Sequence, residues 1–171
     1  MNLLCSFPTT IKTERLTLRP LIDTDRDALV ALFRDELVKK TYMLPDLDDD
    51  DCANALFVRM KDLSISEQRL VRGICLDDAL IGVINDVGVD EDTIEVGYAL
   101  HSDYHNRAYM TEALSAVISE LKLCGFTVRA GAFSENASSI RVMEKCKMRR
   151  IEHTETIEYR ESEHLCIFYE A

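Results

Sequence analysis

The sequence is poor in proline, with three among 171 residues, and it has only six glycines. Hydrophobic residues make up 47% of the chain and charged residues 30%, which excludes a disordered or fibrous protein. A chain of this length falls within the usual size of one domain, and a domain of about 150 residues buries roughly 70% of its unfolded surface. We therefore expect residues 1–171 to form a single domain with one sizeable core.

Basic residues are also in short supply. Asp and Glu number 31 against 20 Lys and Arg, which gives a formal net charge of −11. Non-specific binding to nucleic acid or to an anionic membrane needs a basic surface, so neither is an expected partner. The acidic surplus fits a cationic partner and plain solubility equally well.

Long apolar runs and paired cysteines are missing as well. No stretch approaches the ~18 apolar residues of a membrane span, and residues 1–10 lack the basic start and apolar run of a signal peptide. The six cysteines form no C-x-x-C and do not space with the four histidines as zinc ligands do. We expect a cytoplasmic protein with no metal, whose reduced thiols serve as small apolar side chains. The cysteines are Cys5, Cys52, Cys75, Cys124, Cys146 and Cys166.

Hydrophobic periodicity predicts the elements of the first third of the chain. Residues 15–21 alternate as a strand does, with Leu16 and Leu18 on one face. Asp23 is placed to cap a helix whose buried stripe falls at positions 28, 29, 32 and 33. The acidic run 46–51 is predicted to open a second helix, because it places negative charge at the positive end of the helix dipole. The run is not a calcium loop, because it lacks the glycine and distal glutamate of that motif.

The rest of the chain predicts strands and two further helices. Strands are expected over 71–76, 80–89 and 94–100, separated by acidic turns as in an antiparallel meander. A long helix follows, in which positions 110, 114, 117 and 121 recur at helical spacing and Gly125 marks the end. A strand over 128–133, a helix over 138–146 and strands over 149–159 and 165–169 complete the order. This order indicates an α/β or α+β fold, a sheet covered by helices.

Three local sequences stand out in this order. They are Thr-Glu-Arg-Leu-Thr-Leu-Arg at 13–19, Glu-Val-Gly-Tyr-Ala-Leu at 95–100 followed by Tyr-His-Asn-Arg-Ala-Tyr-Met-Thr-Glu-Ala at 104–113, and Asn-Ala-Ser-Ser-Ile-Arg-Val-Met-Glu-Lys at 136–145. Together they are similar to the GNAT superfamily of N-acetyltransferases, specifically its RimJ/RimL-like branch, over residues 11 to 169. The resemblance implies a mixed, largely antiparallel sheet of about seven strands flanked by about four helices. It also implies acetyl transfer from acetyl-CoA to a primary amine.

The second motif is where the resemblance places the cofactor. A helix N-terminus with free N–H groups suits the pyrophosphate of acetyl-CoA, and residues 104–110 run from a polar turn into the long helix. The family pattern (Gln/Arg)-x-x-Gly-x-(Gly/Ala) reads Asp103, Asn106 and Ala108 here, and asparagine is the non-glycine residue most tolerant of a positive φ. An ordinary helix cap is the alternative reading of this turn. The expected cofactor contacts are Ala99, Leu100, Tyr104, His105, Asn106, Arg107, Ala108, Tyr109, Met110, Asn136, Ser139 and Arg141.

Glu95 is a candidate general base. It shares a strand face with Gly97, and a carboxylate on the cofactor side can take a proton from an alkylammonium of pKa about 10.4, directly or through a water. A solvent-facing strand residue is the alternative reading.

The third motif carries the other implied catalytic residues. Asn136 matches a family asparagine that contacts the pantetheine arm, and Met143 stands where many relatives have a tyrosine as general acid. In the RimL-like pattern a serine takes that role, and Ser139 aligns with it, although a plain helix cap is an alternative. Glu158 falls at the spacing of a glutamate that serves as base in that pattern, so Glu95 and Glu158 both remain candidates.

The implied reaction is direct attack of a neutral amine on the thioester, with a backbone N–H stabilising the oxyanion. A covalent route through Cys124 or Cys146 is disfavoured, because neither has a histidine nearby in sequence. The alternative function is a degenerate domain that binds CoA or a partner without turnover, given the departures at Asp103, Asn106 and Met143. The acceptor, a peptide N-terminus or a small-molecule amine, stays open, as does the choice between monomer and homodimer.

Overall fold

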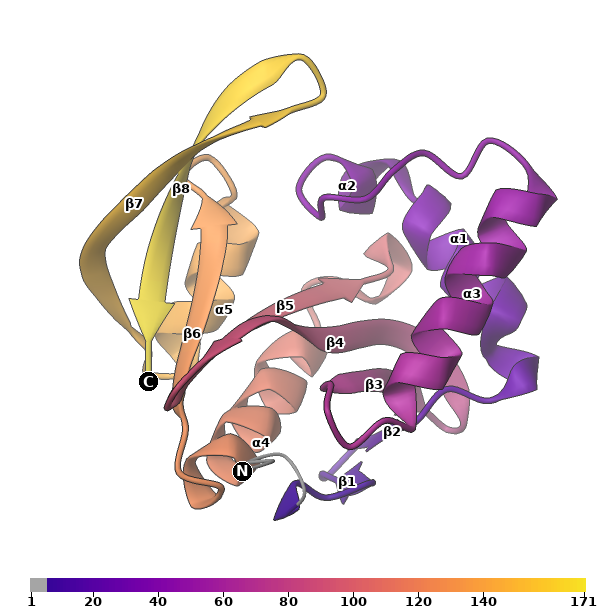
Figure 1. Ribbon diagram of the computed structural model, residues 1–171, viewed down its shortest axis with the longest axis horizontal. Helices are drawn as coiled ribbons and strands as arrows, with labels where there is room; N and C mark the ends of the chain where they lie inside the picture. Colours follow the sequence, from indigo (N-terminus) through magenta and orange to yellow (C-terminus); the bar gives the residue numbers. More distant parts are fainter. Residues whose placement is uncertain (1–5) are drawn as a thin grey trace.

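One eight-stranded sheet runs through the molecule in the order β1-β2-β3-β4-β5-β6-β8-β7 (Figure 1). The computed structural model describes residues 6–171. Cys5 and the first half of segment 1–10, which is predicted not to be a signal peptide, therefore lie outside the described residues. Every neighbouring pair of strands is antiparallel except β5–β6, which is parallel. The strands are β1 (Ile11–Lys12), β2 (Leu16–Arg19), β3 (Val71–Leu76), β4 (Ala79–Asp90), β5 (Thr93–Leu100), β6 (Thr127–Phe133), β7 (Arg149–Tyr159) and β8 (Ser162–Glu170).

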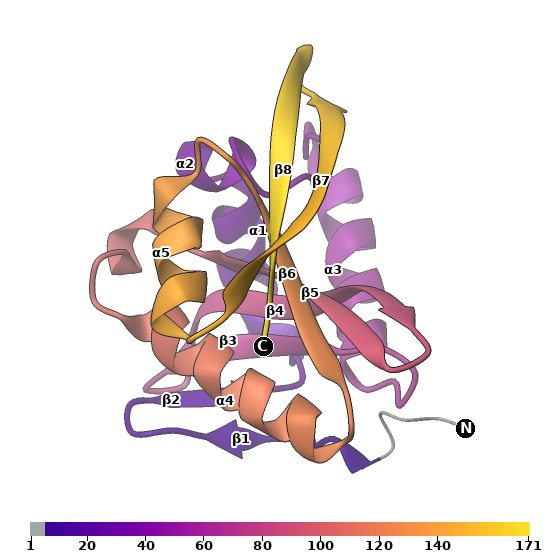
Figure 2. The same cartoon turned by 90° about the vertical axis from the view of Figure 1, so that its left-hand side faces the viewer.

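Helices cover the two faces of the sheet unequally (Figures 1 and 2). One face of β3 and β4 packs against α1 and α3, and the other face packs against α4 and α5. On the side of α1 and α3, no helix covers β6 and the β7–β8 hairpin (Figure 1). The helices are η2 (Asp23–Asp25), α1 (Arg26–Arg34), α2 (Glu36–Lys39), α3 (Asp50–Ser64), η3 (Ser102–Tyr104), α4 (Tyr109–Leu123) and α5 (Ala137–Lys145).

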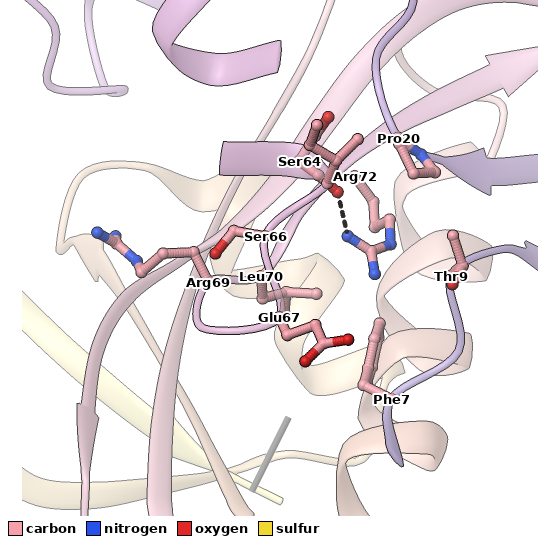
Figure 3. A pocket seen from close by; sticks show the side chains of 10 residues that line it. Phe7, Thr9, Pro20, Ser64, Ser66, Glu67, Arg69, Leu70 and Arg72 are labelled. Atoms are coloured by element: carbon pink, nitrogen blue, oxygen red, sulfur yellow. Dashed lines mark hydrogen bonds between the residues drawn. The ribbon is translucent and has the colours of Figure 1, made fainter. Parts of the chain in front are cut away.

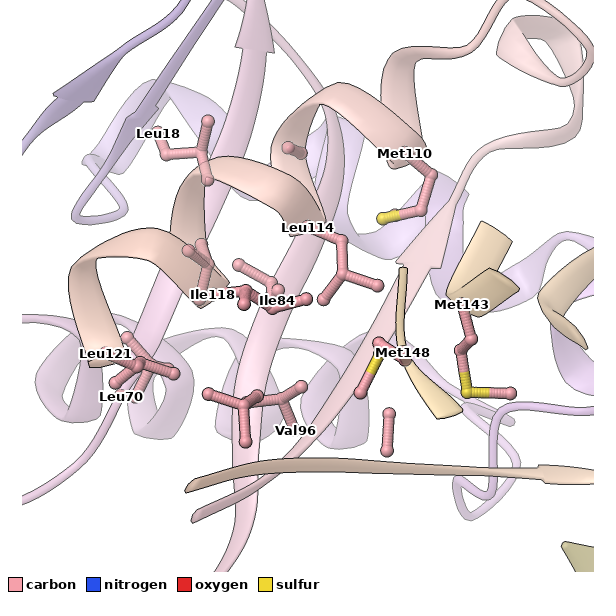
Figure 4. Packing of buried hydrophobic residues seen from close by; sticks show 14 of the residues in the cluster. Leu18, Leu70, Ile84, Val96, Met110, Leu114, Ile118, Leu121, Met143 and Met148 are labelled. Atoms are coloured by element: carbon pink, nitrogen blue, oxygen red, sulfur yellow. The ribbon is translucent and has the colours of Figure 1, made fainter. Parts of the chain in front are cut away.

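Two hydrophobic clusters follow from the alternation of side chains along the central strands. The larger cluster packs Leu114 and Leu121 of α4 and Met143 of α5 against Ile84 and Val96 of the sheet (Figure 4). The smaller cluster joins α1 and α3 to the opposite face of the same strands. A sheet filled on both faces is rigid at its centre, which fixes the strands that carry the site.

The expected fold class is confirmed, with two short additions and one error. The two additions are β1 and α2, whose two and four residues are too few to show a hydrophobic period. Asp23 does not cap α1, because η2 precedes that helix, and Asp23 forms an ion pair with Lys61 instead. The acidic run does open α3 as expected, since the side chain of Asp49 accepts a hydrogen bond from the N–H of Cys52 over 2.8 Å.

The central feature of the sheet is that β5 and β6 separate part-way along their length. They pair from Thr93 opposite Thr127 to Val96 opposite Ala130. Beyond that point β5 stays paired with β4 as far as Leu100, while β6 stays paired with β8. The parallel pair therefore diverges into an opening in the middle of an otherwise continuous sheet (Figure 2).

The segment before β1 is held by a buried arginine (Figure 3). Nη1 of Arg72 donates to the carbonyl of Ser64 over 3.0 Å, and Nη2 donates to the carbonyl of Pro8 over 3.2 Å. The guanidinium also lies over the ring of Phe7, 5.5 Å from its centroid. A pocket of about 160 Å³ opens beside these groups, at the end of α3. Nη1 and Nη2 of Arg72 thus bind backbone carbonyls of two separate segments, so the residue acts as a structural clamp.

Some features of chemical interest are absent from residues 6–171. No helix in this part of the chain is long and apolar enough to cross a membrane. Across the same residues no three His, Cys, Asp or Glu side chains gather as a metal site would require. The five cysteines within that range are all free thiols.

Candidate active site

On one face of the sheet a glycine stands on each strand where β5 and β6 separate. Glu95 lies opposite Arg129 in the last part of the paired region, and two residues further on each strand has a glycine, Gly97 and Gly131. A Cβ on Gly131 would lie 2.8 Å from the ring of Phe168, and one on Gly97 would lie 3.1 Å from Val87. The side chains of Phe168 and Val87 already occupy the space beside these positions, so both positions exclude larger side chains.

A turn with unused backbone amides faces this opening. Asn106 has φ 60° and Ala108 has φ 63°, so the left-handed turn expected at Asn106 is confirmed. His105 fixes the start of the turn, because its Nε2 lies 2.7 Å from the carbonyl oxygen of Leu100 at the end of β5. Among residues 6–171, no hydrogen bond uses the backbone N–H of residues 106–108. These amides and those of the first turn of α4 form a cluster of donors suited to an anion.

The turn is held from behind by the first motif of the sequence. Arg15 donates from Nη1 to the carbonyl of Arg107 over 3.0 Å and from Nε to Glu112 over 2.7 Å. Its guanidinium also lies over the ring of Tyr109, 4.5 Å from the centroid. Burial alone would raise the pKa of Glu112, but hydrogen bonds from Thr13 and Arg15 outweigh it and lower that pKa. Arg15 thus ties the turn and the first turn of α4 to the start of β2.

A second link reaches the same loop from the other side of the sheet. The carboxylate of Asp35, the N-cap of α2, accepts a hydrogen bond from the N–H of Ser102 over 2.9 Å. Burial alone would raise the pKa of Asp35, but the hydrogen bonds from Ser102, Leu37 and Val38 lower it to about 2. The carboxylate therefore stays charged over the whole physiological range and anchors η3.

The third motif places Ser139 against a residue of β5. The side chain of Asn136 caps α5 by accepting a hydrogen bond from the N–H of Ser139 over 3.2 Å, which leaves its Nδ2 as a free donor within the described chain. The hydroxyls of Ser139 and Tyr98 lie 2.8 Å apart, and Tyr98 also reaches the carbonyl of Ser139 at 3.3 Å. Met143, one turn further on, is completely buried in the core. Arg141 is exposed on the same helix.

Glu95 lies on the face of β5 opposite to Tyr98, among charged neighbours. Burial raises the pKa of Glu95, and the nearby carboxylate of Glu155 raises it further. Arg129 and His153 act in the opposite direction, and His153 is itself bonded to Glu155 over 2.8 Å. Glu95 is therefore a carboxyl group of increased basicity beside the point where β5 and β6 separate.

Glu158 lies away from this cluster. It is exposed, sits opposite Glu163 near the tip of the β7–β8 hairpin, and forms no hydrogen bond or ion pair with any described residue. Glu158 lies on the same face of β7 as Thr154. Thr154 pairs with Ile167 of β8, a core residue on the side of the sheet that α5 covers. The structure thus puts Glu158 on the side of Ser139 and Glu95 on the other side of the sheet.

The tip of the hairpin reaches across to the segment between α2 and α3 (Figure 1). The hydroxyl of Tyr159 donates to the carbonyl of Lys39 over 2.6 Å, and Arg160 pairs with Asp46 over 2.7 Å. Tyr42, in the same segment, donates to the side chain of Asn85 on β4 over 2.5 Å. The hairpin and this segment therefore form a roof over the side of the opening on which Glu95 lies.

This geometry has counterparts among known proteins. The family model described as "Acetyltransferase (GNAT) domain" matches residues 15–149. The chain belongs to the GNAT acetyltransferase family. A comparison with curated protein sequences gives no significant match.

Solved structures share the fold of this GNAT domain over nearly its whole length. A GNAT-family acetyltransferase from Bacillus anthracis is 25% identical, with 95% of this chain and 97% of that chain covered and a TM-score of 0.80. The microcin C7 self-immunity acetyltransferase MccE, solved in complex with acetyl-CoA and AMP, is 17% identical, with 98% of both chains covered and a TM-score of 0.82. RimL, a ribosomal L7/L12 alpha-N-protein acetyltransferase solved in complex with coenzyme A, is 14% identical, with 96% of both chains covered and a TM-score of 0.82. The resemblance to the RimL-like branch is thus confirmed at the level of the fold.

Two features of the GNAT site were missed in the sequence analysis. No role was predicted for the side chain of Tyr98, although its place in the second motif is a usable signal. The hold of Arg15 on the cofactor turn joins residues 92 positions apart, and no local pattern reveals such a contact.

Proposed function

We propose that this chain transfers an acetyl group from acetyl-CoA to a primary amine by direct attack in a ternary complex. The observation that carries the proposal is the divergence of β5 and β6 beyond Val96 and Ala130, with the unused amides of residues 106–108 beside it. An opening through a sheet, with an anion site at one end, suits a long thioester cosubstrate with a pyrophosphate.

The cosubstrate is held mainly by local donors. The backbone of Asn106 to Met110 receives the pyrophosphate, and the exposed guanidinium groups of Arg107 and Arg141 add positive charge nearby. The free Nδ2 of Asn136 and the unpaired edge of β5 at Ala99 and Leu100 bind the amide groups of the pantetheine arm. The complexes of MccE with acetyl-CoA and of RimL with coenzyme A support this assignment.

The acceptor enters from the opposite face, under the roof formed by the hairpin. Glu95 and Glu155 make this side negative, which favours a cationic amine over a neutral or acidic acceptor. Both acceptor classes, a peptide N-terminus and a small-molecule amine, meet this requirement. RimL is described as an alpha-N-protein acetyltransferase, which supports the first class.

The two proton transfers take place on opposite faces of the sheet. Glu95 removes a proton from the ammonium group, directly or through a water, because its raised pKa makes it a stronger base than an ordinary glutamate. A backbone N–H of β5 stabilises the oxyanion, and Ser139 gives a proton to the departing thiolate. Glu158 is the second candidate base, and its exposed position on the other face makes it the weaker one.

Two measurements test the proposal in sequence. Acetyl-CoA should raise the melting temperature of the protein, since a ligand that binds only the folded state stabilises it. Thiol release in the presence of a panel of peptides and small amines should then exceed buffer hydrolysis. Binding without thiol release from any amine would instead establish the alternative, a degenerate domain that holds CoA without turnover. We further propose a cytoplasmic site of action, as a monomer or homodimer.

A further inference from the structure

We infer that Tyr98 is a positioning residue for Ser139, and that the two hydroxyls work as one unit across the opening between β5 and β6. The inference rests on the proposed function, because it concerns the proton that the leaving thiolate receives. It assigns a role to a β5 side chain that neither the cosubstrate site nor the general base requires.

The first argument is location. Tyr98 lies two residues beyond the last β5–β6 pair, Val96 opposite Ala130, so its side chain projects where the strands have already separated. It points to the side of α4 and α5, opposite to Glu95. Ser139 lies in the first turn of α5, which follows β6. The contact between Tyr98 and Ser139 therefore joins the two diverging arms on the side where the cosubstrate enters.

The second argument is the hydrogen bonding of Ser139. Its backbone N–H is fixed by Asn136, and its Oγ lies 2.8 Å from the hydroxyl of Tyr98. Among residues 6–171, Oγ has no other hydrogen-bond partner. A serine hydroxyl rotates freely unless a partner selects one orientation, and either hydroxyl of this pair can be the donor. When the Tyr98 O–H donates to Oγ, the Ser139 proton is free to point at the sulfur.

The third argument is the state of the phenol. Burial raises the pKa of Tyr98, so its hydroxyl keeps its proton at any pH at which the protein works. When Ser139 passes its proton to the thiolate sulfur, the Tyr98 O–H donates to the remaining oxygen and stabilises its negative charge. Ser139 then regains a proton from solvent. The amine nitrogen, which lost one proton to Glu95 before attack, loses a second one to solvent as the amide forms, and Glu95 returns its proton to solvent, so the reaction as a whole releases one proton.

The fourth argument is Met143. It is completely buried and has no proton to give, and it occupies the helix position one turn after Ser139. The phenol that contacts Ser139 belongs to Tyr98, which lies on β5 across the opening. Its hydroxyl reaches Ser139 and leaves the sulfur to the serine.

The test uses Tyr98→Phe, Ser139→Ala and the double variant, with Tyr169→Phe as matched control. Tyr169 is a buried tyrosine with one side-chain partner, Glu144 at 3.4 Å, and it lies on β8 opposite Ala130, within the paired part of the sheet. Thiol release is measured with one active amine, at a temperature at least about 15 °C below the lowest melting temperature among the variants.

We expect Tyr98→Phe and Ser139→Ala each to lower kcat by roughly a hundredfold or more, the range of a lost proton donor, with the KM for acetyl-CoA changed less than about threefold. The double variant should be no slower than Ser139→Ala, because residues that act as a unit are not additive. Ser139→Thr, which keeps a hydroxyl, should recover part of the loss only when Tyr98 is present. Tyr169→Phe should keep the wild-type kcat.

Four results would overturn the inference while leaving the acetyltransferase proposal intact. These are a normal kcat for Tyr98→Phe, a normal kcat for Ser139→Ala, effects that multiply in the double variant, and an equal loss in Tyr169→Phe. Acetyl-CoA binding by the wild type with no thiol release from any amine would remove the proposed function, and the inference with it. The two failures are therefore distinguishable in the same assay.

Discussion

Arg15, the residue before β2, donates a hydrogen bond to the backbone carbonyl of Arg107 over 3.0 Å. The two residues belong to different motifs, and the contact turns the carbonyl of Arg107 toward β2. The N–H groups of the same turn are left without partners among the described residues, so they can serve an anion. The first motif thus shapes the cosubstrate site without lining the opening itself.

Replacing Arg15 should therefore weaken acetyl-CoA binding. Arg15→Gln removes the bond to Arg107 and the ion pair with Glu112. A loss of about 1.4 kcal/mol, within the range of one to two hydrogen bonds, raises the Kd for acetyl-CoA roughly tenfold. Isothermal titration calorimetry with acetyl-CoA measures the effect. Arg26→Gln is the control, since it removes a comparable exposed pairing with Asp27 on α1. Equal Kd values for the two variants would contradict the role of Arg15.

Charge at the cosubstrate turn should matter more than charge elsewhere. Arg107→Glu places a carboxylate beside the expected pyrophosphate, and we expect acetyl-CoA affinity to fall by roughly tenfold or more at low salt and by less at 0.5 M salt. Arg59→Glu makes the same change on the exposed side of α3 and should alter the Kd by less than about twofold. If both variants bind alike, net charge rather than the turn governs affinity.

The pH dependence of turnover should report Glu95. Its pKa is raised by burial and by Glu155, so the basic form appears only at a higher pH than for an ordinary glutamate. Activity should therefore rise with pH through this raised pKa. Glu155→Gln removes one negative neighbour, lowers the pKa of Glu95 and should move the acid limb of kcat/KM to lower pH. Glu163→Gln, on the other face of the hairpin, should leave the limb in place. An unmoved limb in Glu155→Gln would exclude Glu95 as the base.

The hairpin roof should affect the acceptor and not the cosubstrate. Tyr159→Phe removes the hydrogen bond to the carbonyl of Lys39 and loosens the contact with the segment between α2 and α3. We expect the KM for the amine to rise about threefold to tenfold, with the Kd for acetyl-CoA unchanged. Steady-state kinetics with the amine varied at saturating acetyl-CoA provides the measurement. A change in acetyl-CoA affinity alone would show that the roof belongs to the other substrate.

Local sequence signals predicted most of the elements, because those elements are long or sharply bounded. The bounds of β3 and β7 agree residue for residue, and the glycine expected after α4 has φ 91°. The prediction was wrong at Asp23, where a single turn of 3-10 helix moves the N-cap of α1 by two residues, to Asp25. Asp25 instead pairs with Arg19 over 2.7 Å, a contact set by tertiary packing that a capping rule does not contain.

The candidate site was predictable in its motifs and not in its connections. Asn106 stands where the family pattern has a glycine, and asparagine tolerates a positive φ, which Asn106 adopts. The pairing of Tyr98 with Ser139 depends on how far β5 and β6 diverge, which is a property of the whole sheet. The opposite placement of Glu95 and Glu158 depends likewise on the face that each strand presents, which for β7 follows a register shift between Arg150 and Thr154.

The divergence of β5 and β6 also gives the protein an unpaired strand edge in its interior. An outer edge of this kind invites pairing with another chain, but here the unpaired edge lies inside the sheet, between β5 and β6. The backbone groups of Gly97 to Leu100 that face the opening should therefore exchange their amide hydrogens quickly in the free protein, although they lie within a central strand. A slender chain of alternating amides that fills the opening would protect them. The cosubstrate would then form hydrogen bonds along the unpaired edge of β5, as a neighbouring strand does elsewhere in the sheet.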